Sequence, residues 1–82
     1  VTHLVAKDAL VAETARLAEL MAGYSPVALH ETKCALNASL EMAFEAAREA
    51  EVAEHARCFA SNDRFEGMNA FIEKRSPDFR GD

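Results

Sequence analysis

The sequence contains few of the residues that usually build a protein core. Its 82 residues include no tryptophan, one tyrosine and five phenylalanines. Half of the residues are apolar, but many of these are alanines, which bury little area per side chain. A chain of this length is near the lower limit at which a single core is stable without further support. The composition therefore predicts a thin core that gains stability from a partner subunit or from the rest of a larger domain.

Three further absences exclude classes of function. The formal net charge is −5, so no basic surface for nucleic acid or an anionic membrane is expected. No apolar run reaches the length of a membrane span, and no signal-peptide pattern is present in these residues. The two cysteines, Cys34 and Cys58, lack a paired spacing and are expected to be reduced thiols in a cytoplasmic protein.

The apolar pattern predicts a mostly helical chain with one short strand at its start. Residues 1–5, VTHLV, alternate like a strand, yet no later segment offers a partner strand. This unpaired strand indicates an incomplete domain. Helical periodicity then recurs four times. The expected helices run between Asp8 and Gly23, from Ser25 to a break at residues 37–39, from about Leu40 to Phe59, and from Ser61 or Asp63 to Ser76-Pro77.

Local signals mark the ends of these helices. Asp8 is the expected N-cap of the first helix, and Ser25 followed by Pro26 is a strong start signal for the second. For the last helix, Asp63 begins a step with capping-box spacing, and Ser61 is the alternative cap. The side chains expected to face inward from the third helix are Leu40, Phe44, Ala47, Val52 and Phe59.

Two His–Cys pairs raise the possibility of a zinc site. His30 and Cys34 are spaced i, i+4, and His55 and Cys58 are spaced i, i+3, so each pair lies on one face of its helix. If the two helices packed antiparallel, the four side chains could form a tetrahedral site. Neither pair has the short loop spacing of ordinary zinc motifs. We therefore favour buried thiols with histidines at solvated edges, and we expect no metal.

No catalytic constellation is recognisable in these residues. The glutamates recur at helical intervals on polar faces, where carboxylates keep ordinary pKa values and are poor general acids. Glu45 with Arg48 and Glu54 with Arg57 are spaced i, i+3, which predicts surface ion pairs. No glycine-rich phosphate loop and no nucleophile with an adjacent base is present. We therefore assign no catalytic residue.

The end of the last predicted helix combines an aromatic side chain with cations. Phe71 and Lys74 are spaced i, i+3 and are expected to share a helix face. One interpretation is a core phenylalanine with Lys74 and Arg75 stabilising the last turn through the helix dipole. The other is a face that holds a flat base and a phosphate. The residues by themselves favour the structural interpretation.

Residues 60–81, ASNDRFEGMNAFIEKRSPDFRG, resemble the C-terminus of the enoyl-CoA hydratase/isomerase (crotonase) family. Members typically end in Ser/Thr-x-Asp-x-x-Glu-Gly-x-x-Ala-Phe-x-x-Lys-Arg-x-Pro-x-Phe. Every fixed position is matched, by Ser61, Asp63, Glu66, Gly67, Ala70, Phe71, Lys74, Arg75, Pro77 and Phe79. Upstream, the family's Ser-Pro turn and its Thr-Lys-x-x-Leu-Asn step are matched by Ser25, Pro26, Thr32, Lys33, Leu36 and Asn37, and residues 1–5 resemble the strand before them.

The resemblance implies that residues 1–82 are the C-terminal helical and oligomerisation segment of a crotonase-like α/β spiral fold, without its N-terminal catalytic core. The parent is expected to be an enoyl-CoA hydratase, a lyase of fatty-acid and acyl-CoA metabolism, and the 82 residues by themselves are expected to be inactive. Its oxyanion-hole donors and acidic residues would lie upstream. The alternatives are an enoyl-CoA isomerase, another acyl-CoA lyase, or a non-catalytic helical module for oligomerisation or coenzyme A binding.

The resemblance also carries expectations about ligands and partners. Phe71 and Lys74 match the family's residues near the adenine and 3′-phosphate of coenzyme A, so they are the expected cofactor-binding residues. No tightly bound cofactor is expected, since the acyl-CoA substrate itself carries the coenzyme A. The family packs its C-terminal helices between subunits, which implies a homo-oligomer, a trimer or a hexamer, in a cytoplasmic protein.

Overall fold

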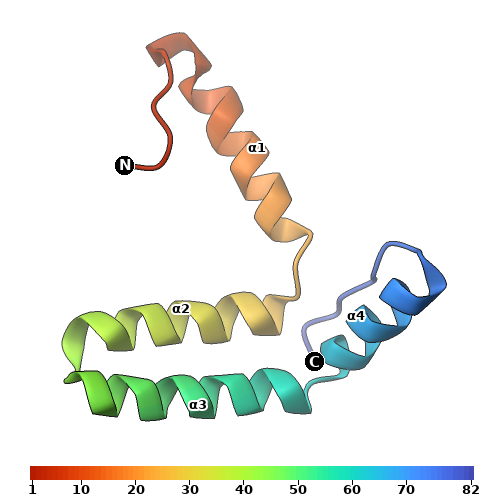
Figure 1. Cartoon of the computed structure of the whole chain (residues 1–82). Coiled ribbons are helices and arrows are strands. Elements are labelled where there is room, and N and C mark those ends of the chain that lie inside the picture. Colours follow the sequence, from red (N-terminus) through yellow and green to blue (C-terminus); the bar gives the residue numbers. More distant parts are fainter.

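The computed structural model describes all residues, Val1–Asp82, and is helical throughout its regular parts. A short 3₁₀ helix, η1, precedes α1, and in Figure 1 α1 stands away from an antiparallel pair formed by α2 and α3. The last helix, α4, lies beside the start of α2, and the C-terminal tail runs back alongside α4 (Figure 1). The mostly helical class predicted from the sequence is confirmed. The elements are η1 Lys7–Ala9, α1 Leu10–Ala22, α2 Pro26–Glu41, α3 Phe44–Ala60 and α4 Asn62–Glu73.

The arrangement is open and flat. The chain extends 42 × 41 × 17 Å, and its radius of gyration is 15.9 Å. A compact chain of this length would have a radius of gyration of about 12 Å. Only Ala70, Glu31 and Asp63 are buried. The thin core expected from the composition is therefore present. No helix combines the length and apolar character needed to cross a membrane.

The strand predicted for residues 1–5 is not formed. Residues 1–6 have no regular secondary structure, and none of the 82 residues belongs to a strand. A strand is stabilised by backbone hydrogen bonds to a neighbouring strand. The alternating pattern of VTHLV has no such neighbour in this chain, so this prediction was wrong for the chain as it stands.

The boundaries of α1 differ from those predicted at its start. Asp8 lies inside η1 and makes no capping hydrogen bond with its side chain, so the predicted N-cap is wrong. The helix ends where Gly23 was expected to stop it, with the Gly23 amide donating to the Leu20 carbonyl at 3.3 Å. Gly23 has φ −80°, an ordinary right-handed value, so it ends the helix without a left-handed turn.

The second helix is longer than predicted. Ser25 caps it as expected, accepting a hydrogen bond from the Ala28 amide at 3.3 Å, and Pro26 occupies the first turn. The predicted break at residues 37–39 does not occur, and the helix continues to Glu41. The Ser39 hydroxyl donates to the Leu36 carbonyl at 2.7 Å, so this polar side chain is satisfied inside the helix. The third helix consequently begins at Phe44 rather than near Leu40.

The α2–α3 pair is joined by charge and leaves its apolar side chains exposed. Glu31 on α2, 8% exposed, accepts from Arg57 Nε on α3 at 2.7 Å, and Arg57 also pairs with Glu54. The predicted Glu54–Arg57 and Glu45–Arg48 pairs are both confirmed. The inward orientation predicted for the third helix is wrong at four positions that are more than half exposed. Leu40 lies on α2 in the structure, and on α3, which little else in the chain covers, the exposed positions are Phe44, Val52 and Phe59.

Candidate functional site

The last helix is capped by Ser61 rather than by a capping box. The Ser61 hydroxyl accepts from the Arg64 amide at 3.3 Å. Asp63 and Glu66 have the spacing of a capping box, but each of their carboxylates binds the C-terminal tail instead. The choice between the two caps therefore depended on tertiary contacts that the spacing does not reveal.

The end of α4 is a Schellman motif with a lysine at its left-handed position. The Arg75 amide donates to the Ala70 carbonyl at 3.0 Å, and the Lys74 amide donates to the Phe71 carbonyl at 3.3 Å. Lys74 has φ 54° and ψ 42°, a conformation that glycine adopts most readily. In any residue with a Cβ atom it costs about 1–2 kcal/mol. Lys74 thus lies beyond the helix and does not continue the face of Phe71, contrary to the predicted i, i+3 pairing.

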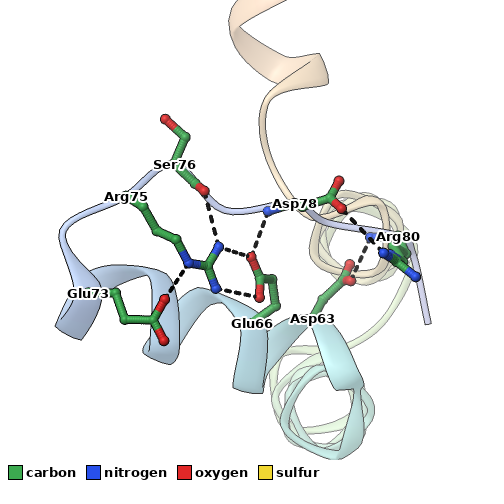
Figure 2. A network of polar contacts seen from close by, with 7 residues as sticks. All are labelled: Asp63, Glu66, Glu73, Arg75, Ser76, Asp78 and Arg80. Carbon is green, nitrogen blue, oxygen red and sulfur yellow. Dashed lines mark hydrogen bonds and ion pairs between the residues drawn. The ribbon is translucent and has the colours of Figure 1, made fainter.

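Asp63 anchors the C-terminal tail and the start of α2, and Figure 2 shows its contact with the tail at Arg80. Its buried carboxylate accepts from the Ser25 hydroxyl at 2.6 Å, from the Arg80 amide at 2.9 Å and from the Gly81 amide at 3.1 Å. The Asp63 amide donates in turn to the Asp82 carbonyl at 3.1 Å. The hydroxyl of Ser25, and then the two tail amides, lower the pKa of Asp63 below its ordinary value. One side chain therefore connects three segments of the chain.

Glu66 holds the preceding part of the tail through Arg75 (Figure 2). Arg75 donates to both Glu66 oxygens, at 2.6 and 2.9 Å, and its Nε donates to Glu73 at 2.6 Å. The Asp78 amide adds a hydrogen bond to Glu66 at 2.7 Å. The bidentate Arg75 contact, followed by the Asp78 amide, lowers the pKa of Glu66 from 4.5 to about 2. Arg75 therefore connects the tail to α4. One interpretation of the sequence gave Arg75 a different role, stabilisation of the last helical turn through the helix dipole.

Acid is expected to detach the tail in a defined pH range. A carboxylate whose folded pKa lies below its unfolded pKa stabilises the folded form above the unfolded value, and this contribution is lost as the pH falls through the folded pKa. For Glu66 the docked tail should be insensitive to pH above about 5 and released between 4.5 and about 2. Amide hydrogen exchange of residues 76–82 measured from pH 6 downwards, corrected for intrinsic rates, tests this. A matched Glu66→Gln chain should be less protected at pH 6 and should lose the part of the acid response that Glu66 contributes, keeping only the part due to Asp63, whose pKa is also lowered. Identical profiles for the two chains would contradict the role of Glu66.

The tail also packs closely at two glycines. A Cβ atom on Gly67 would lie 3.4 Å from Phe79 Cε1, so the phenyl ring rests directly on α4. Gly81 has φ 79°, and a Cβ atom there would lie 3.2 Å from Pro26 Cβ. At Gly67 a side chain larger than a methyl group would displace the Phe79 ring, whereas at Gly81 the positive φ and the close approach of Pro26 disfavour any side chain.

The docked tail contributes one residue, Phe79, to the lining of an apolar cleft of about 480 Å³. Phe71, the predicted aromatic contact residue, lines the cleft and is itself 86% exposed in these residues. Lys74 does not line the cleft; it follows the end of α4, three residues beyond Phe71. The other lining residues come from α2, from the end of α3, from α4 and from the tail: Ser25, Ala28, His55, Cys58, Phe59, Ser61, Asp63, Arg64, Gly67, Met68 and Phe79.

The four side chains of the possible zinc site do not meet. His30 Nε2 and Cys34 Sγ lie 3.7 Å apart, as their i, i+4 spacing allows. No group of three or more His, Cys, Asp or Glu side chains in the chain is arranged to hold a metal ion. The zinc hypothesis therefore has no structural support.

Two residues of this region were not identified from the sequence as chemically important. Asp63 was considered only as a helix cap and as a matched position of the family motif, because its hydrogen-bond partners Ser25, Arg80 and Gly81 are distant in sequence. Arg64 was not considered at all, although its guanidinium lies in the cleft wall between two phenyl rings. Arg64 could have been singled out from the sequence because it places a cation in the first turn of a predicted helix, where the helix dipole disfavours positive charge.

Comparison with known proteins identifies the family. A profile described as Enoyl-CoA hydratase/isomerase matches residues 1–82. The 2,3-dehydroadipyl-CoA hydratase of Escherichia coli K12 is 38% identical over 81 residues, 99% of this chain and 32% of that protein. The mitochondrial enoyl-CoA hydratase of Pongo abelii is 35% identical over 80 residues, 98% of this chain and 28% of that protein. The chain therefore belongs to the enoyl-CoA hydratase/isomerase family.

A solved structure supports the same assignment. The crystal structure of enoyl-CoA hydratase from Mycobacterium tuberculosis H37Rv matches with a TM-score of 0.90 at 27% identity, covering 100% of this chain and 32% of its own. The family and the helical part of a crotonase fold, both predicted from the tail motif, are confirmed. The chain spans about a third of the length of the relatives that it matches.

Proposed function

We propose that these residues form the C-terminal helical region of an enoyl-CoA hydratase, which adds water across the double bond of a 2-trans-enoyl-CoA thioester. The observation that carries the proposal is a family match over residues 1–82, together with relatives named as hydratases at 35–38% identity. In this proposal the catalytic core lies outside these residues, which themselves supply no catalytic group. The acyl-CoA is a substrate, and no tightly bound cofactor is needed.

The reaction itself can be tested on the full-length protein. Hydration removes the conjugated double bond of crotonyl-CoA, so ultraviolet absorbance of the enoyl thioester should fall and 3-hydroxybutyryl-CoA should appear. An isomerase would instead move the double bond of a 3-enoyl-CoA without adding water. Detection of only the isomerised product, or of another acyl-CoA cleavage, would replace the hydratase proposal by one of its alternatives within the family.

Phe71 and Lys74 are proposed to bind the adenine and 3′-phosphate end of coenzyme A. Phe71 is an exposed aromatic side chain on a cleft wall, suited to stack on a flat base. Lys74 retains a strained left-handed backbone at a position where glycine would be more stable. Strain of this kind is found more often at functional positions than elsewhere. Contact between the Lys74 ammonium and a phosphate would account for a lysine, rather than a glycine, at this strained position.

Replacement of Lys74 should raise KM for the CoA thioester about tenfold and change kcat less than about twofold, because the lysine holds a remote group equally in ground and transition states. Both Lys74→Ala and Lys74→Gly should show this in steady-state kinetics of the full-length enzyme. Lys74→Gly should also raise stability by about 1 kcal/mol, since glycine relieves the left-handed backbone. A weaker substrate affinity therefore cannot result from unfolding.

A matched control is Lys7→Ala, which removes a cation from η1 at the opposite end of the chain. It should leave both constants unchanged. Equal KM values for the wild type and both Lys74 variants would return Lys74 to the role of a helix terminus and would remove it from the proposed site.

The exposed apolar side chains support a role in subunit packing. Leu40 is 86% exposed and Phe44 is 77% exposed, at the turn between α2 and α3. Burying such side chains against another surface is favourable by about 25 cal/mol per Å². We propose a homo-oligomer, a trimer or a hexamer, in the cytoplasm; relatives named as mitochondrial make the mitochondrion the alternative. A non-catalytic module remains the alternative function, favoured if the full-length protein binds coenzyme A without turnover.

A further inference from the structure

The C-terminal tail, residues 76–82, is held by one face of α4 in the way that a protein holds an extended peptide. The amides of Asp78 and Arg80, two residues apart, both point to α4, where they donate to Glu66 at 2.7 Å and to Asp63 at 2.9 Å (Figure 2). Alternate residues of an extended chain face the same side. The helix therefore recognises the backbone of the tail.

Further contacts select particular side chains of the tail. The ring of Phe79 rests on Gly67, the only glycine of α4, where a Cβ atom would lie 3.4 Å from it. Two residues later, Gly81 donates to Asp63 at 3.1 Å, and a Cβ atom on Gly81 would lie 3.2 Å from Pro26. The site therefore fits a phenylalanine that is followed two residues later by a glycine.

The acceptors and contact surfaces that bind the tail lie outside it. They belong to α4 and to the start of α2: Ser25, Pro26, Asp63, Glu66 and Gly67. The Asp63 carboxylate also accepts from the Ser25 hydroxyl at 2.6 Å, a contact that holds it in position without the tail. The composition of the site therefore does not depend on which molecule supplies the tail.

The connection between α4 and the tail is short and strained. The chain reverses direction at Lys74, which has φ 54°, a left-handed value that is unfavourable for a residue with a Cβ atom. Pro77 then restricts Ser76 to an extended conformation and fixes its own φ. A short strained hinge favours exchange of the segment that follows it, because the hinge relaxes while the same contacts form on another copy.

We propose that this face of α4, with the start of α2, is a peptide-docking site that binds residues 77–82 of a second copy of the chain as well as its own. The ligand is an extended segment with the pattern Pro-x-Phe-x-Gly. The covalent connection gives a copy's own tail a high effective concentration, so docking between copies prevails where that tail is absent. The proposal is independent of the enzymatic activity of the full-length protein.

Complementation between two full-length variants tests the exchange. One copy carries Asp63→Ala, which disables its site and leaves its tail free, and the other lacks residues 77–82 but keeps its site. An excess of the second copy should slow amide exchange of Arg80 and Gly81 in the first about tenfold, as measured by hydrogen–deuterium exchange. These two amides exist only in the first copy, so the signal reports docking in trans. Unchanged exchange would overturn the proposal.

A matched control separates docking from general association. A deletion copy that also carries Asp63→Ala has neither the tail nor its main acceptor. Its addition should leave exchange of Arg80 and Gly81 in the first copy unchanged. Equal slowing by both deletion copies would mean that Asp63 does not bind the tail in trans, and the proposal would be wrong.

The wild type provides a test that needs no deletion. The acetylated peptide Pro-Asp-Phe-Arg-Gly-Asp, added at millimolar concentration, should occupy the site whenever the attached tail leaves it. It should accelerate exchange of the protein's own Arg80 and Gly81 amides about fivefold. The same peptide with alanine in place of phenylalanine should have no effect, and equal results with the two peptides would contradict recognition of the tail. If the peptide accelerates exchange but the two variants do not complement each other, the second copy is not the ligand and the proposal is overturned.

Discussion

Asp63→Ala is expected to release the C-terminal tail and to accelerate amide exchange of Arg80 and Gly81 roughly 100-fold, as measured by hydrogen–deuterium exchange of the full-length protein. The substitution leaves these two amides and the Ser25 hydroxyl without their shared acceptor, and hydrogen bonds to a charged group are among the stronger ones. Without the Asp63 carboxylate the tail would keep the contacts of Glu66 and Phe79 and the hydrogen bond from the backbone amide of residue 63 to the Asp82 carbonyl.

The matched control is Asp78→Ala. Asp78 is an exposed carboxylate of the tail itself, paired loosely with Arg80 at 3.5 Å, and surface pairs of this kind contribute little. Its removal should change exchange at Gly81 by less than about twofold. Unaltered protection of the tail in the Asp63 variant would mean that the buried carboxylate is not its anchor.

Opposite effects are expected from two substitutions of Gly67. Gly67→Leu should lower Tm by roughly 5–10 °C, because the added atoms occupy the place of the Phe79 ring, which would lie only 3.4 Å from a Cβ atom at this position. Gly67→Ala places only that Cβ atom, at an ordinary contact distance, and replaces glycine by the best helix former. It should stabilise α4 by about 0.5–1 kcal/mol.

Differential scanning calorimetry of the three proteins distinguishes steric exclusion from a general intolerance of this position. A destabilised alanine variant would show that the ring cannot move by even a few tenths of an ångström. A leucine variant as stable as the wild type would show that Phe79 is not packed on Gly67 in solution. The second result would also remove Phe79 from the lining of the cleft that Phe71 and Arg64 line.

Local stability is reduced at two positions of α4. Lys74 occupies a left-handed site that glycine would fill with less strain. Arg64 places a cation at the wrong end of the helix dipole and leaves a buried donor unpaired. Local preferences are usually consistent with the fold, and exceptions concentrate where function requires them. Both exceptions lie within one turn of the ends of the helix that carries Phe71.

The local part of the structure was predictable from the residues. Ser25 followed by Pro26 begins α2, Gly23 ends α1, and the ion pairs at i, i+3 form as their spacing indicates. These features depend on neighbours within one helical turn. The family was likewise predictable, because the spacing of Asp63, Gly67 and Phe71 with the following tail is specific.

The roles of those motif residues required the tertiary structure. The sequence by itself determined that the chain is helical, where most helices begin or end, and which family it belongs to, because short-range spacing carries that information. Only the fold decided that Asp63 accepts hydrogen bonds from Ser25 and the tail, that VTHLV stays without a strand partner, and that Arg64 lies between two phenyl rings. The Asp63 contacts join residues 17–38 positions apart, and the strand depends on a surface that the chain does not contain, so no local pattern specifies them.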